Sequence, residues 1–299
     1  MNIDFKNQVV VITGGAGSLG SAYVRAFSAK GAKVVINDPG TSLDGQGSGE
    51  KPAEVLAEQI CAAGGEAISN QNSIAEPEGA RELIAQAMDA FGRVDVVINN
   101  AGNMRDQMFK KLDFESFEAV LRVHLFGSTY VTRAAFPIMI EQDYGRILMT
   151  TSAAGLYGAF GGASYAAAKA GIVGLMRTLS IEGKKHNIGV NAIAPVAKSR
   201  MLGTMLSEKE LERLTPESIC PAVLYLCSDV CKATGDIISA GSGYFSKVAM
   251  VEGKGVRFPI EEKVTPENIA GCYDEITDMS AAYPYEDVWE VLSHVMARN

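Results

Sequence analysis

Short apolar runs alternate with amphipathic stretches along the first 240 residues of the chain. The apolar runs predict strands near 8–12, 33–37, 66–70, 94–98, 145–151, 188–193 and 236–239. Between them, apolar residues recur at helical spacing and predict helices near 19–30, 51–63, 76–91, 114–141, 163–185 and 217–227. This alternation predicts an α/β fold with a doubly wound parallel sheet of seven strands and helices on both faces.

The alternation ends after Gly241. A helix is expected to begin with Thr265 as N-cap and Pro266 at its first position, and a last helix is expected near 285–297. Apolar faces are predicted on these helices at Ile269, Tyr273, Ile276, Val288, Trp289, Leu292 and Val295. They are too few for an independent core. We therefore expect one domain over 1–249 and an extension over 250–299 that packs on the domain or on a dimer, with a flexible recruiting tail as the alternative.

A glycine-rich turn follows the first predicted strand, in the stretch VVVITGGAGSLG, and the second strand ends at Asp38. Glycines let backbone N–H groups approach a pyrophosphate at a helix N-terminus. An acid at the tip of the second strand can accept from both ribose hydroxyls and would repel a 2′-phosphate. Because no arginine or lysine directly follows Asp38, we predict that the cofactor is NAD and not NADP.

A second cluster of reactive side chains is formed by Ser152, Tyr165 and Lys169. Tyr165 and Lys169 are four residues apart and share one face of a helix. An ammonium beside a phenol favours phenolate, so we expect Lys169 to lower the pKa of Tyr165 toward neutrality. The tyrosine could then exchange a proton with a substrate oxygen, which Ser152 would hold.

These two clusters are predicted to meet. Asp38, Asn99, Ser152 and Pro195 each follow a predicted strand. Because the carboxyl ends of parallel strands lie at one edge of a sheet, the side chains should form a single site there.

Together these motifs resemble the short-chain dehydrogenase/reductase family. Its T-G-x-x-x-G-x-G motif corresponds to Thr13–Gly20 and its N-N-A-G motif to Asn99–Gly102. The resemblance implies a Rossmann-type fold and hydride transfer, with Tyr165 as acid/base and Lys169 on the nicotinamide ribose. It also implies a set of cofactor contacts: Gly14, Gly17, Ser18, Leu19, Gly20, Asp38, Asn72, Ser73, Asn100, Ala101, Gly102, Tyr165, Lys169, Pro195 and Lys198.

Three positions depart from the family pattern. Ser18 replaces the middle glycine of the turn, and Asn72 replaces the acid that meets the adenine amine. His124 replaces a helix asparagine that often anchors a proton-relay water. A histidine here could hold that water as a catalytic residue or could be a core residue with its polar atoms satisfied.

A narrower resemblance covers PGTSLDGQGSGE, RVHLFGS and APVAKSRM and fades after about residue 250. These segments are similar to the (3R)-hydroxyacyl-CoA dehydrogenase unit of peroxisomal multifunctional β-oxidation enzymes. The resemblance implies oxidation of a (3R)-3-hydroxyacyl-CoA to the 3-oxoacyl-CoA by a homodimer. The alternatives are a 17β-hydroxysteroid or steroid side-chain acyl-CoA dehydrogenase and, less favoured, a non-catalytic NAD-binding regulatory protein. Five basic residues could meet CoA phosphates or be simply solvated: Arg105, Lys110, Lys111, Lys198 and Arg200.

Composition narrows the remaining possibilities. The net charge is −8 with no basic run, so nucleic-acid binding is not expected. No apolar run reaches about 18 residues, so membrane insertion is not expected. The N-terminus does not resemble a signal peptide and MARN is not a peroxisomal signal, which predicts a cytoplasmic location. Among five cysteines, Cys227 and Cys231 are expected to be buried apolar residues, and no metal is predicted.

Overall fold

The sheet that organises the molecule contains one strand more than the sequence predicts. The computed structural model describes residues 3–41, 51–197, 207–259 and 261–297. Within these residues the sheet has eight strands in the order β3-β2-β1-β4-β5-β6-β7-β8, and the pairs from β3 through to β7 are parallel. The strands are β1 (Val9–Thr13), β2 (Lys33–Asn37), β3 (Glu66–Asn70), β4 (Val96–Asn99), β5 (Gly145–Thr150), β6 (Ile188–Pro195), β7 (Ile237–Gly241) and β8 (Tyr244–Val248).

The additional strand, β8, comes from a tight turn. Ser242 and Gly243, which separate β7 from β8, have φ values of 51° and 79°. Two consecutive residues with positive φ match the two-residue hairpin turn that reverses a strand beside its predecessor. No residue of β8 is buried, which suits a strand at the edge of the sheet. The strand was not predicted because its sequence has no continuous apolar run.

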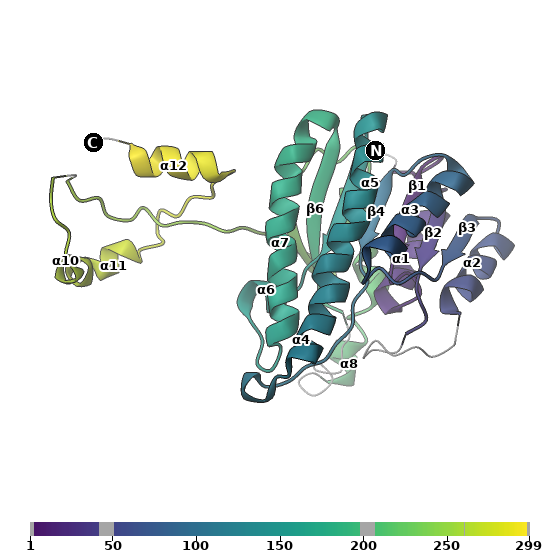
Figure 1. The fold of residues 1–299 in the computed structure, drawn as a ribbon, viewed down its shortest axis with the longest axis horizontal. Coiled ribbons are helices and arrows are strands. Elements are labelled where there is room, and N and C mark those ends of the chain that lie inside the picture. Colours follow the sequence, from purple (N-terminus) through teal and green to yellow (C-terminus); the bar gives the residue numbers. More distant parts are fainter. Residues whose placement is uncertain (1–2, 42–50, 198–206, 260, 298–299) are drawn as a thin grey trace. The chain divides into compact units, whose positions relative to one another are not determined.

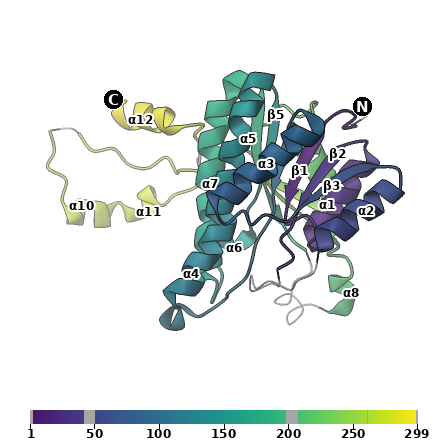
Figure 2. The ribbon, with the colours of Figure 1, turned by 45° about the vertical axis from the view of Figure 1, so that its right-hand side comes forward.

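Helices cover both faces of the sheet, as predicted. On one face α3, α5 and α7 lie side by side, and on the other α1 packs against α2 and α9 (Figures 1 and 2). Buried apolar residues from these helices and the central strands form the core. The helices of this region are α1 (Ser18–Ala29), α2 (Pro52–Ala62), α3 (Pro77–Phe91), α4 (Phe114–Leu121), α5 (Ser128–Gln142), α6 (Ala153–Tyr157), α7 (Ala163–Gly183), α8 (Glu208–Leu211) and α9 (Cys220–Cys227), with 3₁₀ turns η1 (Phe109–Lys111), η3 (Lys184–His186) and η5 (Pro216–Ser218).

The prediction of one continuous helix over 114–141 is wrong in the middle of that stretch. A π-helical segment, η2 (Arg122–Gly127), separates α4 from α5. A π turn carries more residues per turn than an α turn, so it changes which side chains face inward. His124 and Gly127 are the buried residues of this segment. The interruption therefore lies where the sequence departs from its family.

The C-terminal residues form a compact unit of their own. The chain divides into units 1–247 and 248–299. The second unit contains α10 (Pro266–Gly271), α11 (Tyr273–Ile276) and α12 (Val288–Met296). Thr265 caps α10 as predicted, since its side chain accepts from the Asn268 N–H. None of the described residues after 247 is buried, so the unit has no core of its own, and its packing on the domain or on a dimer remains a prediction.

Candidate active site

The glycine turn after β1 is closed around backbone atoms. Gly14 has φ +60°, and a Cβ added there would lie 2.8 Å from Ala101 Cα. A Cβ on Gly20 would lie 2.1 Å from the Gly14 carbonyl oxygen. The Gly17 N–H donates to that same oxygen at 3.2 Å. Gly14 and Gly20 therefore have no room for a side chain at the turn that leads into α1. A dinucleotide pyrophosphate would need close access to backbone N–H groups here, so the turn fits such a group.

The segment after β4 holds this turn in place. Thr13 Oγ1 accepts from the N–H groups of Asn100 at 3.0 Å and Ala101 at 3.1 Å. The Asn100 side-chain amide donates to the carbonyl oxygens of Thr13 and Gly14 at 3.0 and 3.1 Å. The side chain of Asn99 points elsewhere and donates to Thr132 Oγ1 at 2.9 Å. The side chain of Asn100 therefore holds two loops of the predicted cofactor site together.

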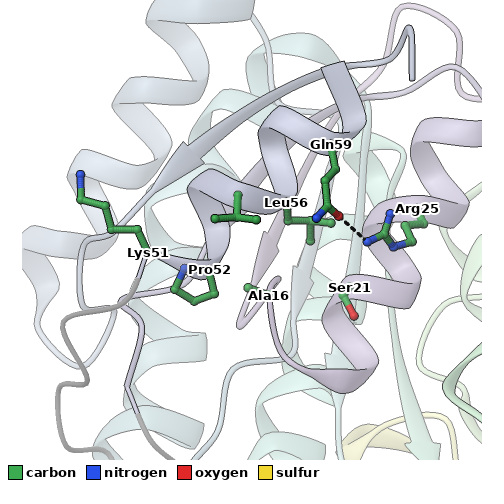
Figure 3. Close-up of a pocket in the computed structure, with 8 residues that line it drawn as sticks. Ala16, Ser21, Arg25, Lys51, Pro52, Leu56 and Gln59 are labelled. Atoms are coloured by element: carbon green, nitrogen blue, oxygen red, sulfur yellow. Dashed lines mark hydrogen bonds between the residues drawn. The ribbon is translucent and has the colours of Figure 1, made fainter. Parts of the chain in front are cut away.

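Asp38 lies beside the glycine turn. Its carboxylate accepts from the Ala16 N–H at 3.2 Å and from the Gly40 N–H at 3.0 Å. These bonds hold the acid at the end of β2, where it can meet ribose hydroxyls. Ala16 also borders a pocket of about 540 Å³ between α1 and α2, shown in Figure 3. Arg25 and Lys51 line that pocket, so basic side chains do lie near the turn although none directly follows Asp38.

The remaining predicted cofactor residues are placed around the same edge. Asn72 donates its side-chain amide to Glu82 at 2.9 Å, which leaves its carbonyl oxygen as the acceptor. Ser73 accepts from the Ala75 N–H at 3.3 Å. Ser18 is exposed at the first position of α1 and Leu19 is half-buried behind it. Pro195 ends β6 opposite Ala240. Lys198 and Arg200 lie outside the described residues.

Ser152, Tyr165 and Lys169 are brought together at the end of β5. Ser152 is the N-cap of α6, where its Oγ accepts from the Ala154 N–H at 3.2 Å, and it also hydrogen-bonds with Tyr165. Lys169 is buried on α7, and its Nζ donates to the Thr150 carbonyl oxygen at 2.6 Å. The same Nζ lies 5.6 Å from the centroid of the Tyr165 ring. The geometry thus places a hydroxyl, a phenol and an amine in one cluster.

The electrostatics of this cluster differ from the expectation. Burial raises the pKa of Tyr165, the Ser152 hydrogen bond opposes this rise, and the Asp106 carboxylate adds to it. Burial also lowers the pKa of Lys169 to about 7. The prediction that Lys169 lowers the tyrosine pKa is therefore wrong for this arrangement of side chains. Removal from water disfavours both the phenolate and the ammonium, and it is the largest influence on the pKa of each group.

His124 is buried against Tyr165. Its ring lies edge-on to the ring of Tyr165, with centroids 5.2 Å apart and planes at 86°. Its Nε2 lies 3.1 Å from the backbone N and 2.8 Å from the backbone O of Asn103. Its Nδ1 is buried and has no hydrogen-bond partner among the described residues. Burial, and next the charge of Lys169, lower the pKa of His124 to about 3.

The loop after β4 supplies residues that sequence reasoning missed. The Gln107 N–H donates to the Gly161 carbonyl oxygen at 2.9 Å, and Gln107 forms an isolated bridge with Gly162. This bond ties the loop to the residues just before α7 and thereby brings Asp106 close enough to act on Tyr165. Nothing in the local sequence signals a contact between segments 54 residues apart.

Comparisons with known proteins identify the family of this chain. Residues 8–210 match the family model described as short chain dehydrogenase. The chain belongs to the short-chain dehydrogenase/reductase family, and it is an oxidoreductase of that family. A short-chain type dehydrogenase/reductase of Mycobacterium tuberculosis is 42% identical over 93% of this chain and 96% of its own length.

Other relatives are longer proteins. The peroxisomal hydratase-dehydrogenase-epimerase of Saccharomyces cerevisiae is 45% identical over 93% of this chain, which corresponds to 31% of that protein. The full-length peroxisomal multifunctional enzyme type 2 of Drosophila melanogaster superposes with a TM-score of 0.84 at 33% identity. That match covers 98% of this chain and 49% of the other. The chain therefore spans about a third to a half of these multifunctional relatives, and the narrower resemblance read from the sequence is confirmed.

Proposed function

We propose that this protein oxidises a (3R)-3-hydroxyacyl-CoA to the 3-oxoacyl-CoA with NAD. The observation that carries the proposal is the cluster of Ser152, Tyr165 and Lys169 beside a glycine turn, in a chain 45% identical to a hydratase-dehydrogenase-epimerase. Bound NAD would supply the hydride acceptor. The glycine turn and Asp38 would hold its adenosine half, and Lys169 would hold its nicotinamide ribose.

The side chains of this site would manage the proton and the substrate oxygen. Ser152 would donate a hydrogen bond to the hydroxyl oxygen of the substrate and keep it beside Tyr165. Tyr165 would accept the proton that leaves this oxygen, and Lys169 would favour the phenolate once its ammonium is held near the ring. Because the pKa of Tyr165 is raised in the protein alone, we infer that the catalytic ionisation develops only when cofactor and substrate complete the site.

The acyl-CoA part of the proposal is supported by the loop that borders the site. Lys110 and Lys111 lie in η1, and both are exposed. The neighbouring Gln107 is bonded to the residues just before α7, so the loop that carries the two cations is tied to the segment that leads to Tyr165. Exposed cations in this place could meet CoA phosphates, although the whole chain is acidic.

Two assays test the reaction. Tyr165→Phe should lower kcat by about 10²–10⁴-fold, because it removes the group that accepts the proton. Tyr157→Phe is the matched control, since Tyr157 is a 74% exposed tyrosine on the neighbouring α6. Near wild-type turnover of Tyr165→Phe would contradict the mechanism.

A substrate panel separates the alternatives. R- and S-3-hydroxyacyl-CoA esters of several chain lengths are assayed beside free 17β-hydroxysteroids and a steroid side-chain acyl-CoA. Turnover of the R esters supports the proposal, while preference for either steroid class replaces its substrate. Absence of turnover with tight NAD binding would favour the non-catalytic regulatory protein.

We also propose a homodimer formed through α5 and α7. Gly174 of α7 is exposed, and a Cβ added there meets nothing within 4 Å. Ile140 at the end of α5 and Ile181 on α7 are exposed apolar residues as well. Sedimentation of the wild type and of Gly174→Trp tests this surface, since a bulky ring should dissociate a dimer packed on it.

Two further predictions concern the extension and the location. The extension 250–299 should pack on the domain or the dimer, so a chain ending at 249 should lose stability or activity. If it keeps both, the recruiting tail is favoured. The cytoplasmic location stays a prediction, because the named multifunctional relatives are peroxisomal. Within the described part of the chain, no helix has both the length and the apolar character needed to span a membrane.

A further inference from the structure

We propose that His124 is a positioning residue whose ring locks Tyr165 to the loop after β4, and that Gly102 must lack a side chain because this ring fills its space. His124 would work as a fixed, uncharged ring and would not carry protons. The effect on turnover rests on the proposed function, whereas the link between the two residues does not.

The ring of His124 is held from two sides. On one side its Nε2 contacts the backbone of Asn103, with 3.1 Å to the N and 2.8 Å to the O. A single ring nitrogen can accept from the N–H or donate to the carbonyl, so either tautomer keeps this bond. On the other side the ring meets Tyr165 edge-on at a centroid distance of 5.2 Å. One buried side chain thus joins the loop that braces the glycine turn to the proposed acid/base.

Gly102 shows how closely this ring is fitted. A Cβ built on Gly102 would lie 2.2 Å from His124 Cε1 and 2.9 Å from each ring nitrogen. Gly102 is not among the residues with positive φ, so its backbone conformation would accept alanine. The ring cannot swing aside without losing the Asn103 bond. The need for glycine at 102 therefore comes from His124 and not from the backbone.

The uncharged state of the His124 ring supports a role in positioning Tyr165 and not a role in proton transfer. Burial lowers the pKa of His124 to about 3, so the ring is uncharged across the working pH range. Lys169 and Tyr165 on α7 are the titratable groups beside it, and an uncharged ring avoids a second cation next to Lys169. Because the contact with Asn103 occupies Nε2, only Nδ1 would remain for a relay.

A double-mutant cycle on thermal stability tests the steric link. Gly102→Ala should lower Tm by about 5 °C in the wild-type protein, as overpacking does, but by less than about 1 °C in a His124→Asn background. His124→Ser serves as a second background if His124→Asn does not fold. Gly271→Ala on α10, whose added Cβ meets nothing within 4 Å, is the glycine control. Equal losses in both backgrounds would overturn the link, whatever the protein is found to catalyse.

Turnover by two variants of His124 distinguishes a positioning role from a proton-relay role. His124→Phe keeps a ring against Tyr165 but has no nitrogen, whereas His124→Asn can hold a water but has no ring. Positioning predicts that His124→Phe, which keeps a ring against Tyr165 but loses the bond to Asn103, lowers kcat by up to about tenfold, and that His124→Asn, which loses the ring, lowers it by about a hundredfold. The acidic limb of the kcat/KM pH profile should shift only in His124→Asn, where water reaches Tyr165. If His124→Asn keeps wild-type turnover and His124→Phe loses it, the ring acts as a relay and the proposal fails.

Discussion

The glycine turn and the catalytic cluster lie at the same edge of the sheet but satisfy their polar groups differently. At the turn, backbone groups and the side chains of Thr13, Asn100 and Asp38 bond to one another. At the cluster, polar atoms are buried without partners among the described residues: Asn99 Oδ1, Asn103 Oδ1, His124 Nδ1 and Thr150 Oγ1. The side chains of Thr13, Asn100 and Asp38 at the turn are therefore paired before any ligand binds, whereas the cluster has buried side-chain atoms with hydrogen-bonding capacity left to use.

This difference predicts two kinds of sensitivity. Changes of shape should damage the turn, because its atoms are already in contact. Changes of charge should damage the cluster, because its titratable groups are held away from water. Four substitutions, taken from the largest expected effect to the smallest, test whether the two ends respond in these separate ways.

Lys169→Met should have the largest effect, with kcat falling by about 10³-fold, because it removes the buried amine that lies beside Tyr165. The free energy of unfolding should move in the opposite direction to kcat, because the variant no longer buries an amine. The pKa of Lys169 is about 7 in the folded protein and about 10.4 in an unfolded chain, so the unfolded chain binds more protons between these values. Wild-type stability should therefore rise from pH 7 to 10 more than that of Lys169→Met, in denaturant titrations at each pH. If the free energies of unfolding of the wild type and of Lys169→Met change in parallel with pH, Lys169 is not desolvated.

Gly20→Ala should raise the Kd for NAD by about a hundredfold, since the new methyl group would lie 2.1 Å from a backbone oxygen. Gly17→Ala is the control within the same turn, because its nearest contact is at 3.3 Å. Calorimetric titration with NAD measures both. If the two alanine variants weaken binding equally, the loss does not come from the steric contact at Gly20.

Asp38→Ser should lower kcat/KM for NAD by about tenfold and raise it for NADP, because the acid that meets the ribose hydroxyls is gone. Arg25 and Lys51 in the neighbouring pocket give this variant nearby cations. The ratio of kcat/KM for the two cofactors is the measurement. A wild-type preference for NADP would contradict the assignment of Asp38.

Asp106→Asn should have the smallest effect. The Asp106 carboxylate raises the pKa of Tyr165, so its removal should move the acidic limb of kcat/KM to lower pH. Asp106 is exposed, so added salt should shrink the shift. Glu115→Gln, at an exposed acid in the first turn of α4, is the control. A shift toward higher pH would exclude a direct effect of this charge.

The fold was largely predictable because strand and helix periods differ and the strands are buried on both faces. Asp38, Ser152 and Pro195 could be placed at one edge because each follows such a strand. The π-helical turn around His124 was not predictable, because its residues continue the apolar spacing of an ordinary helix. The π turn nevertheless decides that His124 faces Tyr165.

The direction in which the pKa of Tyr165 shifts could not be predicted from the sequence either. The four-residue spacing to Lys169 reports that the two side chains share a helix face, but not how far each is removed from water. Burial comes from the surrounding loops, and it reverses the expected sign. The contact of Gln107 with Gly161 depends in the same way on the three-dimensional arrangement of loops that have no periodic pattern.

The missing core of the C-terminal unit has a consequence for amide hydrogen exchange. Its three helices have six, four and nine residues, lengths at which isolated helices are marginal in water. A segment without buried residues opens at almost no cost in free energy, so its amide hydrogens should exchange within seconds. Protection of the backbone amides of Leu292 and Val295 therefore directly reports that another surface covers α12, and the degree of protection measures how strongly that surface holds it.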